Sequence, residues 1–169
     1  SVDGAMTKSP LGGGDSGKSP VDRGKMGVKR SLCTDAKGIP LSIVIAGANR
    51  HDVKLLQETL TNLQITRPKP AFLRAQHLCL DAGYVSPATI KLAATMNFIL
   101  HLRSRGEEAK KVLRIGKRKA RRWVVERSHS WLNRFRRILI RWEKISDRYL
   151  SMLYLACAII TWRQVGLLR

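Results

Sequence analysis

The chain has 169 residues, 44% of them hydrophobic, which is enough to bury a core and argues against a disordered protein. Its 32 Lys and Arg against 12 Asp and Glu give a formal net charge of +20, which favours a polyanionic partner such as nucleic acid. The apolar run 149–162 is shorter than the roughly 20 residues that cross a bilayer, and the three cysteines lie far apart. We therefore expect one domain in a reducing cytoplasm, without a disulfide, a zinc site or a membrane partner.

The positive charge is concentrated in residues 103–148, which hold 17 of the 32 Lys and Arg and five acidic residues. A segment of this kind is expected to lie along a phosphate backbone. A solvated basic face has the same composition, and so have structural RNA-binding proteins. The charge therefore indicates nucleic acid without naming an activity.

The first elements in chain order are a strand and a loop. The chain begins SVD, without an initiator Met, and we interpret it as a fragment of a longer protein whose residues 2–7 form the first strand. Residues 9–27 contain six Gly and two Pro, so we expect a flexible loop without a regular element. Within it, GGGDSGKS satisfies the phosphate-loop pattern of nucleotide hydrolases. Such a loop needs a helix that starts at Ser19, and the Gly residues that follow argue against one, so we treat the match as chance.

The next stretch predicts a hairpin and a helix. Residues 29–35 and 39–47 are rich in Ile, Val, Leu and Thr, and Ala36-Lys37-Gly38 between them is typical of a short turn. The segment 49–52 supplies short polar residues that cap a helix, and leucines recur at helical spacing up to about residue 64. We expect His51 and Asp52 to shape this turn and cap the helix, although His51 also has the chemistry to approach a site or DNA.

The middle of the chain predicts strand, helix and strand. Residues 76–81 form a short apolar run that ends in an acid, Ser86-Pro87 starts a helix to about residue 96, and 98–102 read as another strand. The order strand, strand, strand, helix, strand, helix, strand and then long helices predicts an α/β fold with a mixed sheet flanked by helices.

Residues 120–142 predict one amphipathic helix. Its apolar stripe consists of Val124, Trp131, Leu132, Phe135, Ile138, Leu139 and Trp142. The opposite face holds Arg122, Glu126, His129, Asn133 and Arg137, so Glu126 is expected to face solvent or a ligand. The run 149–162 predicts a buried helix. Trp123 lies off the stripe and is left without a role.

Three acids have positions that suit phosphodiester chemistry. Two-metal catalysis needs carboxylates from different elements, because hard divalent cations prefer oxygen ligands. Asp3 lies on the first strand, Asp81 ends a strand that we expect to be its parallel neighbour, and Glu126 lies on the basic helix. Taken singly, each acid is as well explained as a turn former, a helix cap or a solvated charge.

Four segments together resemble the DDE transposases of bacterial insertion sequences, in the group numbered four and five. They are SVDGAMTKSP, GVKRSLCTDAKGIPLSIVIAGANRHD, LCLDAGY and RWVVERSHSWLNRFRRILIRWE, in the family's order. The resemblance implies a ribonuclease H-like fold and a catalytic, metal-binding triad of Asp3, Asp81 and Glu126. It also implies two Mg²⁺ or Mn²⁺ ions, cleavage at the ends of the element, and attack of the freed 3′-hydroxyl on target DNA.

The basic residues near Glu126 depart in part from the family's signature. Arg122 stands at the expected place, whereas Lys119 occupies the Tyr position and Asn133 the Lys position. We expect DNA contacts from Lys117, Arg118, Lys119, Arg122, Arg127, Asn133, Arg134 and Arg137.

The resemblance also sets expectations about partners. We expect double-stranded DNA, both insertion-sequence ends and target, a location in the bacterial cytoplasm near the nucleoid, and compatibility with a homodimer. The amino-terminal domain that recognises element ends in such enzymes is not found in these residues. An inactive remnant of a transposase and a basic binding module without catalysis both stay open as alternatives.

Overall fold

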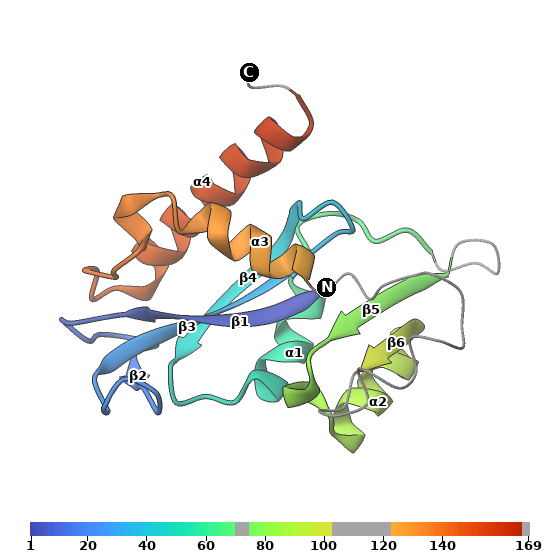
Figure 1. Ribbon diagram of the computed structural model, residues 1–169, viewed down its shortest axis with the longest axis horizontal. Helices are drawn as coiled ribbons and strands as arrows, with labels where there is room; N and C mark the ends of the chain where they lie inside the picture. Colours follow the sequence, from blue (N-terminus) through green and yellow to red (C-terminus); the bar gives the residue numbers. More distant parts are fainter. Residues whose placement is uncertain (70–74, 103–122, 167–169) are drawn as a thin grey trace.

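The computed structural model describes residues 1–69, 75–102 and 123–166 (Figure 1). In chain order the elements are β1 (Val2–Lys8), β2 (Gly17–Lys18), β3 (Met26–Thr34), β4 (Pro40–Gly47), α1 (Asp52–Thr61), β5 (Gln76–Leu80), the 3₁₀ turn η1 (Ala82–Tyr84), α2 (Pro87–Thr95), β6 (Phe98–Leu102), α3 (Trp123–Leu132), the 3₁₀ turn η2 (Arg136–Ile138) and α4 (Ser146–Gln164). This order confirms the predicted α/β pattern.

β3 is the centre of a four-stranded antiparallel sheet. β3 pairs with β1 on one side, where Val2 is opposite Cys33, and with β4 on the other side. The short strand β2 pairs with the first residues of β3, Met26 and Gly27. The predicted hairpin of β3 and β4 is confirmed. Its turn is closed by Asp35, whose Oδ1 accepts hydrogen bonds of 2.8 Å from the backbone of Lys37 and of Ile39.

β5 and β6 form a separate two-stranded parallel sheet, joined by α2. The predicted helix start is confirmed, because Ser86 caps α2 with its side chain and Pro87 occupies the first turn. We expected β5 to be the parallel neighbour of the first strand. β1 and β5 do contact each other, but among the described residues no hydrogen-bonded ladder joins them.

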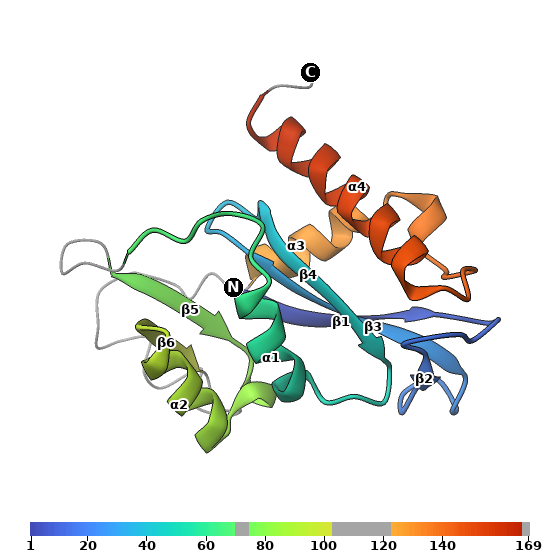
Figure 2. The same ribbon diagram turned by 180° about the vertical axis from the view of Figure 1, so that it is seen from behind.

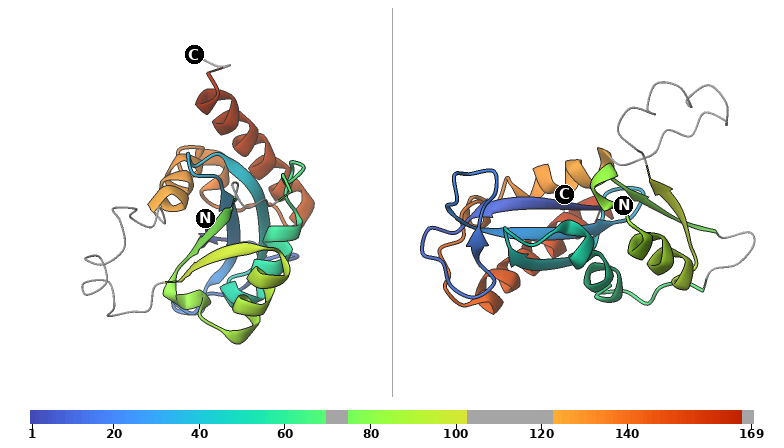
Figure 3. Two further views of the ribbon diagram at one scale, coloured as in Figure 1. Left: turned by 90° about the vertical axis from the view of Figure 1, so that its right-hand side faces the viewer. Right: turned by 90° about the horizontal axis from the view of Figure 1, so that it is seen from below.

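Two apolar clusters lie on opposite faces of the strands. One contains β3 and β4 residues with α3 and α4, and the other contains Val2 and Cys33 with α1, α2, β5 and β6. Figure 3 shows α3 on one side of the strands and α1 and α2 on the other, and Figure 2 shows α1 and α2 in front of the strands. Since side chains alternate along a strand, Val2 and Asp3 face opposite clusters.

The Gly-rich segment 9–27 is packed against the rest of the molecule. It contains β2, its Ser9 is fully buried, and a Cβ on Gly13 would lie 2.2 Å from the carbonyl oxygen of Lys144. The expectation that it contains no regular element is therefore wrong, while its flexibility stays a prediction. Ser19 follows β2 and is succeeded by turns, so no helix begins there, in agreement with our prediction that the phosphate-loop match is due to chance.

The predicted continuous helix 120–142 is also wrong. α3 ends at Leu132, and the chain turns through η2 so that Ile140 bridges to Lys8 at the end of β1. Buried Arg141 stabilises this path by donating to the carbonyl oxygens of Glu143 at 2.8 Å and of Lys144 at 3.2 Å. Trp142 is consequently 50% exposed instead of lying in the core. Tertiary contacts of the backbone override the amphipathic pattern here.

The final helix α4 follows, and it contains the predicted buried run. Tyr149, Leu153, Ala156, Cys157 and Ile160 are its buried residues. None of the described helices is long and apolar enough to cross a membrane. The three cysteines, Cys33, Cys79 and Cys157, are free thiols.

Candidate active site

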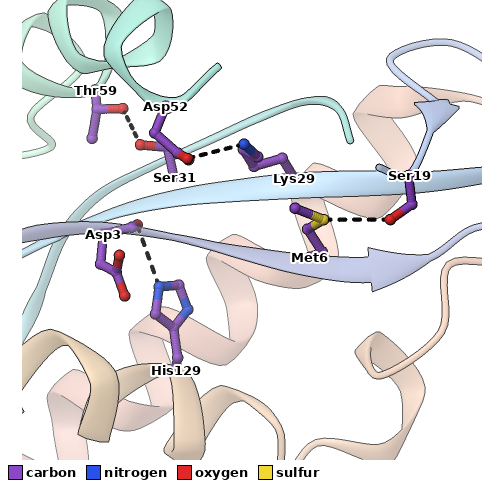
Figure 4. A network of polar contacts seen from close by, with 8 residues as sticks. All are labelled: Asp3, Met6, Ser19, Lys29, Ser31, Asp52, Thr59 and His129. Carbon is purple, nitrogen blue, oxygen red and sulfur yellow. Dashed lines mark hydrogen bonds and ion pairs between the residues drawn. The ribbon is translucent and has the colours of Figure 1, made fainter. Parts of the chain in front are cut away.

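Asp3 lies at the start of β1 and faces α3 (Figure 4). It is half-buried, and burial is the main cause that raises the pKa of its carboxyl group to about 6. The negative charges of Glu126, Asp52 and Asp81 raise this pKa further, against a hydrogen bond with the Gly4 backbone that lowers it. Asp3 therefore lies in the field of three other carboxylates.

Asp81 follows β5 and begins the turn η1. Its Oδ1 accepts a hydrogen bond of 2.6 Å from the backbone nitrogen of Ala82. Tyr84 at the end of η1 is 2% exposed and packs in the cluster with α1 and α2. Burial raises the pKa of its hydroxyl group, and so do the nearby charges of Asp52, Asp3 and Asp81. The buried ring thus anchors the turn that carries Asp81.

Glu126 lies in the first turn of α3 and is exposed, as predicted. The helix is fixed to the turn between β3 and β4. Ser128 donates a hydrogen bond of 2.7 Å to the carbonyl oxygen of Gly38, and Arg127 donates one of 2.6 Å to that of Lys37. Gly38 has φ +85°, and a Cβ there would lie 2.9 Å from the Ser128 hydroxyl. The hairpin turn therefore sets the position of the Glu126 helix.

His129 joins α3 to the strand that carries Asp3. Its Nε2 lies 3.3 Å from the carbonyl oxygen of Asp3, and the residue is 6% exposed. Burial, with the charge of Arg30, lowers the pKa of His129 to about 4, so its ring is neutral at pH 7. We expected His129 on the solvent-facing side of the helix. That expectation is wrong, because this part of α3 packs on β1.

The three predicted carboxylates thus come from β1, the end of β5 and α3, and the charges of Asp81 and Glu126 both act on Asp3. Within the described residues, no three His, Cys, Asp or Glu side chains are close enough together to hold a metal ion. The structure brings the acids into one neighbourhood without assembling a closed metal cage.

Asp52 is a fourth acid of this neighbourhood. Lys29, which is 5% exposed, donates to Asp52 Oδ2 at 3.0 Å (Figure 4). A Cβ on Gly4 would lie 2.1 Å from Asp52 Oδ1, so only Gly at this position permits the approach. We expected His51 and Asp52 to cap α1. The cap position is His51, which makes no capping hydrogen bond through its side chain, so that part is wrong.

The predicted DNA-binding residues are only partly described. Arg127 lies 4.7 Å from the ring centres of Trp123 and Trp131, so its guanidinium is held between two aromatic side chains. Asn133 accepts a hydrogen bond of 2.9 Å from Arg30, and Arg134 is exposed. Arg137 is also exposed and forms an ion pair with Glu143. Outside the described residues lie Lys117, Arg118, Lys119 and Arg122.

Comparison with known proteins adds a family to this geometry. The transposase DDE domain family matches residues 2–161, which is nearly the whole chain. The chain belongs to the DDE transposases. It is also 35% identical, over 153 residues, to a Burkholderia cepacia protein named as a transposase for insertion sequence element IS402; the match covers 86% of this chain and 68% of that protein.

The resemblance to insertion-sequence transposases is therefore confirmed. No solved structure matches the chain significantly. Transposition and DNA recombination are accordingly the processes to which this DDE transposase belongs, with DNA as its partner.

Proposed function

We propose that this chain cleaves insertion-sequence DNA and joins it to target DNA, with Asp3, Asp81 and Glu126 as the catalytic, metal-binding residues. The observation that carries the proposal is the field at Asp3. Its pKa is raised by both Glu126 and Asp81, although the three acids are far apart in sequence. Structural acids are seldom gathered in this way, because mutual repulsion destabilises the fold unless a cation offsets it.

The carboxylates fit divalent metal ions in donor chemistry. Mg²⁺ and Mn²⁺ prefer oxygen ligands, and carboxylates that lie close enough to repel one another provide them. A pair of such ions would supply the Lewis acid that phosphodiester chemistry requires. We propose that cation binding draws the side chains of Asp3, Asp81 and Glu126 closer together, since no three acidic side chains of the described residues are close enough to hold a metal ion.

Two reactions follow from this assignment. In cleavage, the oxygen of water attacks the phosphorus at the element's end and the bond to the 3′-oxygen breaks, which leaves a 3′-hydroxyl. In transfer, that 3′-hydroxyl attacks a target phosphorus, loses its proton and displaces another 3′-oxygen. No covalent bond to the protein forms in either step. The exposed Arg134 and Arg137 are proposed to hold phosphates, and Arg127 is proposed to keep α3 on the hairpin turn.

A ribonuclease H-like fold is part of the same proposal. The long antiparallel strands β1, β3 and β4, then helix α1, then the parallel strands β5 and β6 joined by α2, follow the element order of such a fold, and β1 contacts β5. We propose that the chain forms a single domain of this type. Action on insertion sequences would place the protein at the bacterial nucleoid.

The test is cleavage by an Asp81→Asn variant, with Asp147→Asn on the exposed start of α4 as the matched control. Asp81→Asn should abolish Mg²⁺-dependent cleavage of a duplex that carries the element's end, while its DNA affinity at fixed salt stays the same or rises. Asp147→Asn should cleave normally. A wild type that binds DNA but never cleaves it with Mg²⁺ or Mn²⁺ would instead support a binding module or an inactive remnant.

A further inference from the structure

Among the described residues, the two faces of the β5–β6 sheet differ in exposure. On β5, Leu78 and Leu80 are each 2% exposed and pack in the cluster with α1 and α2. Because side chains alternate along a strand, His77 and Cys79 point to the opposite face. His77 is exposed there and Cys79 is half-buried.

β6 repeats this alternation beside β5. Phe98, Leu100 and Leu102 pack in the same cluster, whereas Ile99 is 47% exposed and His101 is also exposed. In the parallel register His77 is opposite Ile99, and Cys79 is opposite His101. We call this surface, made of His77, Cys79, Ile99 and His101, the imidazole face.

The imidazole face is on the catalytic side of the molecule. Val2 of β1 packs in the cluster with α1 and α2, so Asp3 points to the other side, where α3 lies (Figures 3 and 4). Asp81 directly follows β5, and its negative charge raises the pKa of Asp3. The strand β5 therefore connects the imidazole face to Asp81, one of the three carboxylates of the candidate site.

The two histidines form a pair that presents polar groups outward. His77 Nδ1 and His101 Nε2 are 2.7 Å apart, close enough for one to donate a hydrogen bond to the other. Burial and the neighbouring His77 lower the pKa of His101, which favours the neutral form of the His101 ring. A neutral imidazole carries one N–H and one acceptor nitrogen. In a neutral pair, the ring that donates the hydrogen bond keeps an acceptor nitrogen, and the ring that accepts it keeps an N–H. The pair therefore offers one donor and one acceptor to a ligand.

The formal net charge of the chain, +20, attracts a polyanion to its surface. An N–H donor, two flat aromatic rings and an exposed Ile suit a nucleic-acid strand, whose phosphates accept hydrogen bonds and whose bases stack on rings.

We propose that the imidazole face binds DNA. The DNA strand that enters the site of Asp3, Asp81 and Glu126 lies along this face. The inference rests on the proposed function, since it takes Asp81 as part of the catalytic site. It adds a DNA-binding surface outside α3 and assigns a role to His77 and His101.

Cys79 provides a direct test, because Cys33 and Cys157 are 6% and 8% exposed. We would measure the rate at which a maleimide modifies Cys79 in the folded wild type, in EDTA, with and without a saturating duplex of random sequence. DNA should slow the modification about tenfold or more. The matched control is Cys79→Ser with Ala88→Cys, which puts an exposed thiol at the start of α2, on the far side; its rate should not change with DNA.

A second measurement uses His77→Ala with His101→Ala, two exposed positions where truncation leaves the core intact. This double variant should bind the duplex about threefold to tenfold more weakly, while Lys91→Ala with Ala88→Ser on α2 binds as the wild type does. Unchanged modification of Cys79 under conditions where a mobility shift shows binding would overturn the inference. Protection of Cys79 by raised protein concentration without DNA would overturn it too, since a second copy would then cover the face. Neither result affects the cleavage test with Asp81→Asn, so the two proposals fail separately.

Discussion

The replacement of Asp3 by Asn tests the electrostatics of the candidate site most directly. The pKa of Asp3 is about 6 in the folded protein against 3.8 for an unperturbed group. This rise in the pKa corresponds to about 3 kcal/mol against the charged form. Asp3 is only half-buried, and solvent screening reduces this figure to about 1–2 kcal/mol.

The sign follows from proton linkage. Above pH 6 Asp3 is ionised in both states, so its full penalty destabilises the folded protein. As the pH falls from about 6 to about 3.8, the folded state takes up the proton first and the wild type regains that stability. Asp3→Asn has no such penalty, so at pH 7 without metal it should be more stable than the wild type by about 1–2 kcal/mol, and the gap should close near pH 4.

Urea unfolding in EDTA at pH 7 and pH 4 measures this gap, with Asp147→Asn as a control that changes charge outside the site. Added Mg²⁺ should then stabilise the wild type more than Asp3→Asn, because the ligand is lost. A variant that is less stable than the wild type at pH 7, or a gap that does not depend on pH, would refute the electrostatic reasoning.

Three other substitutions have outcomes that the structure sets. The pKa of His129 is lowered from 6.5 to about 4, so the wild type should lose up to about 3 kcal/mol relative to His129→Gln as the pH falls from 6.5 to 4, measured by urea unfolding. Gly38→Ala should cost about 2 kcal/mol, by thermal unfolding, because φ is +85° and its Cβ would press on Ser128; equal stability would contradict the tight contact. Asp52→Asn leaves buried Lys29 without its counter-charge and should cost about 2 kcal/mol, less than a fully buried pair, whereas Asp52→Asn with Lys29→Met should recover most of it.

Local patterns predicted the elements well where short-range chemistry decides them. The turn Ala36-Lys37-Gly38, the Ser86 cap with Pro87 and the apolar run of β5 were all readable because hydrogen bonds and sterics act within a few residues. The helix 120–142 failed for the opposite reason. Its periodicity continues past Leu132, but pairing of the chain near Ile140 with Lys8 needs a turn that no local signal marks.

The candidate site divides in the same way. The sequence suggested Asp3 because it lies on a predicted strand, and Asp81 because it ends one. It suggested Glu126 because it lies on a basic helix, and the family resemblance supported all three. Asp52 and His129 were misjudged, as a cap and as a solvent-facing residue. Both depend on contacts across strands: Asp52 meets Lys29 of β3, and His129 meets the carbonyl oxygen of Asp3. Only a weak signal existed for Asp52, the Gly at position 4 that permits its approach.

By itself the sequence determined the charge, the order of the longer strands and of the helices up to α3, and the acids available for metal chemistry, since composition and local periodicity are properties of the chain. Only the tertiary structure decided that α3 stops at Leu132, that Lys29 neutralises Asp52, and that His77 and His101 meet on one face of the β5–β6 sheet. Each of these depends on contacts between residues distant in sequence, which burial and strand register select together.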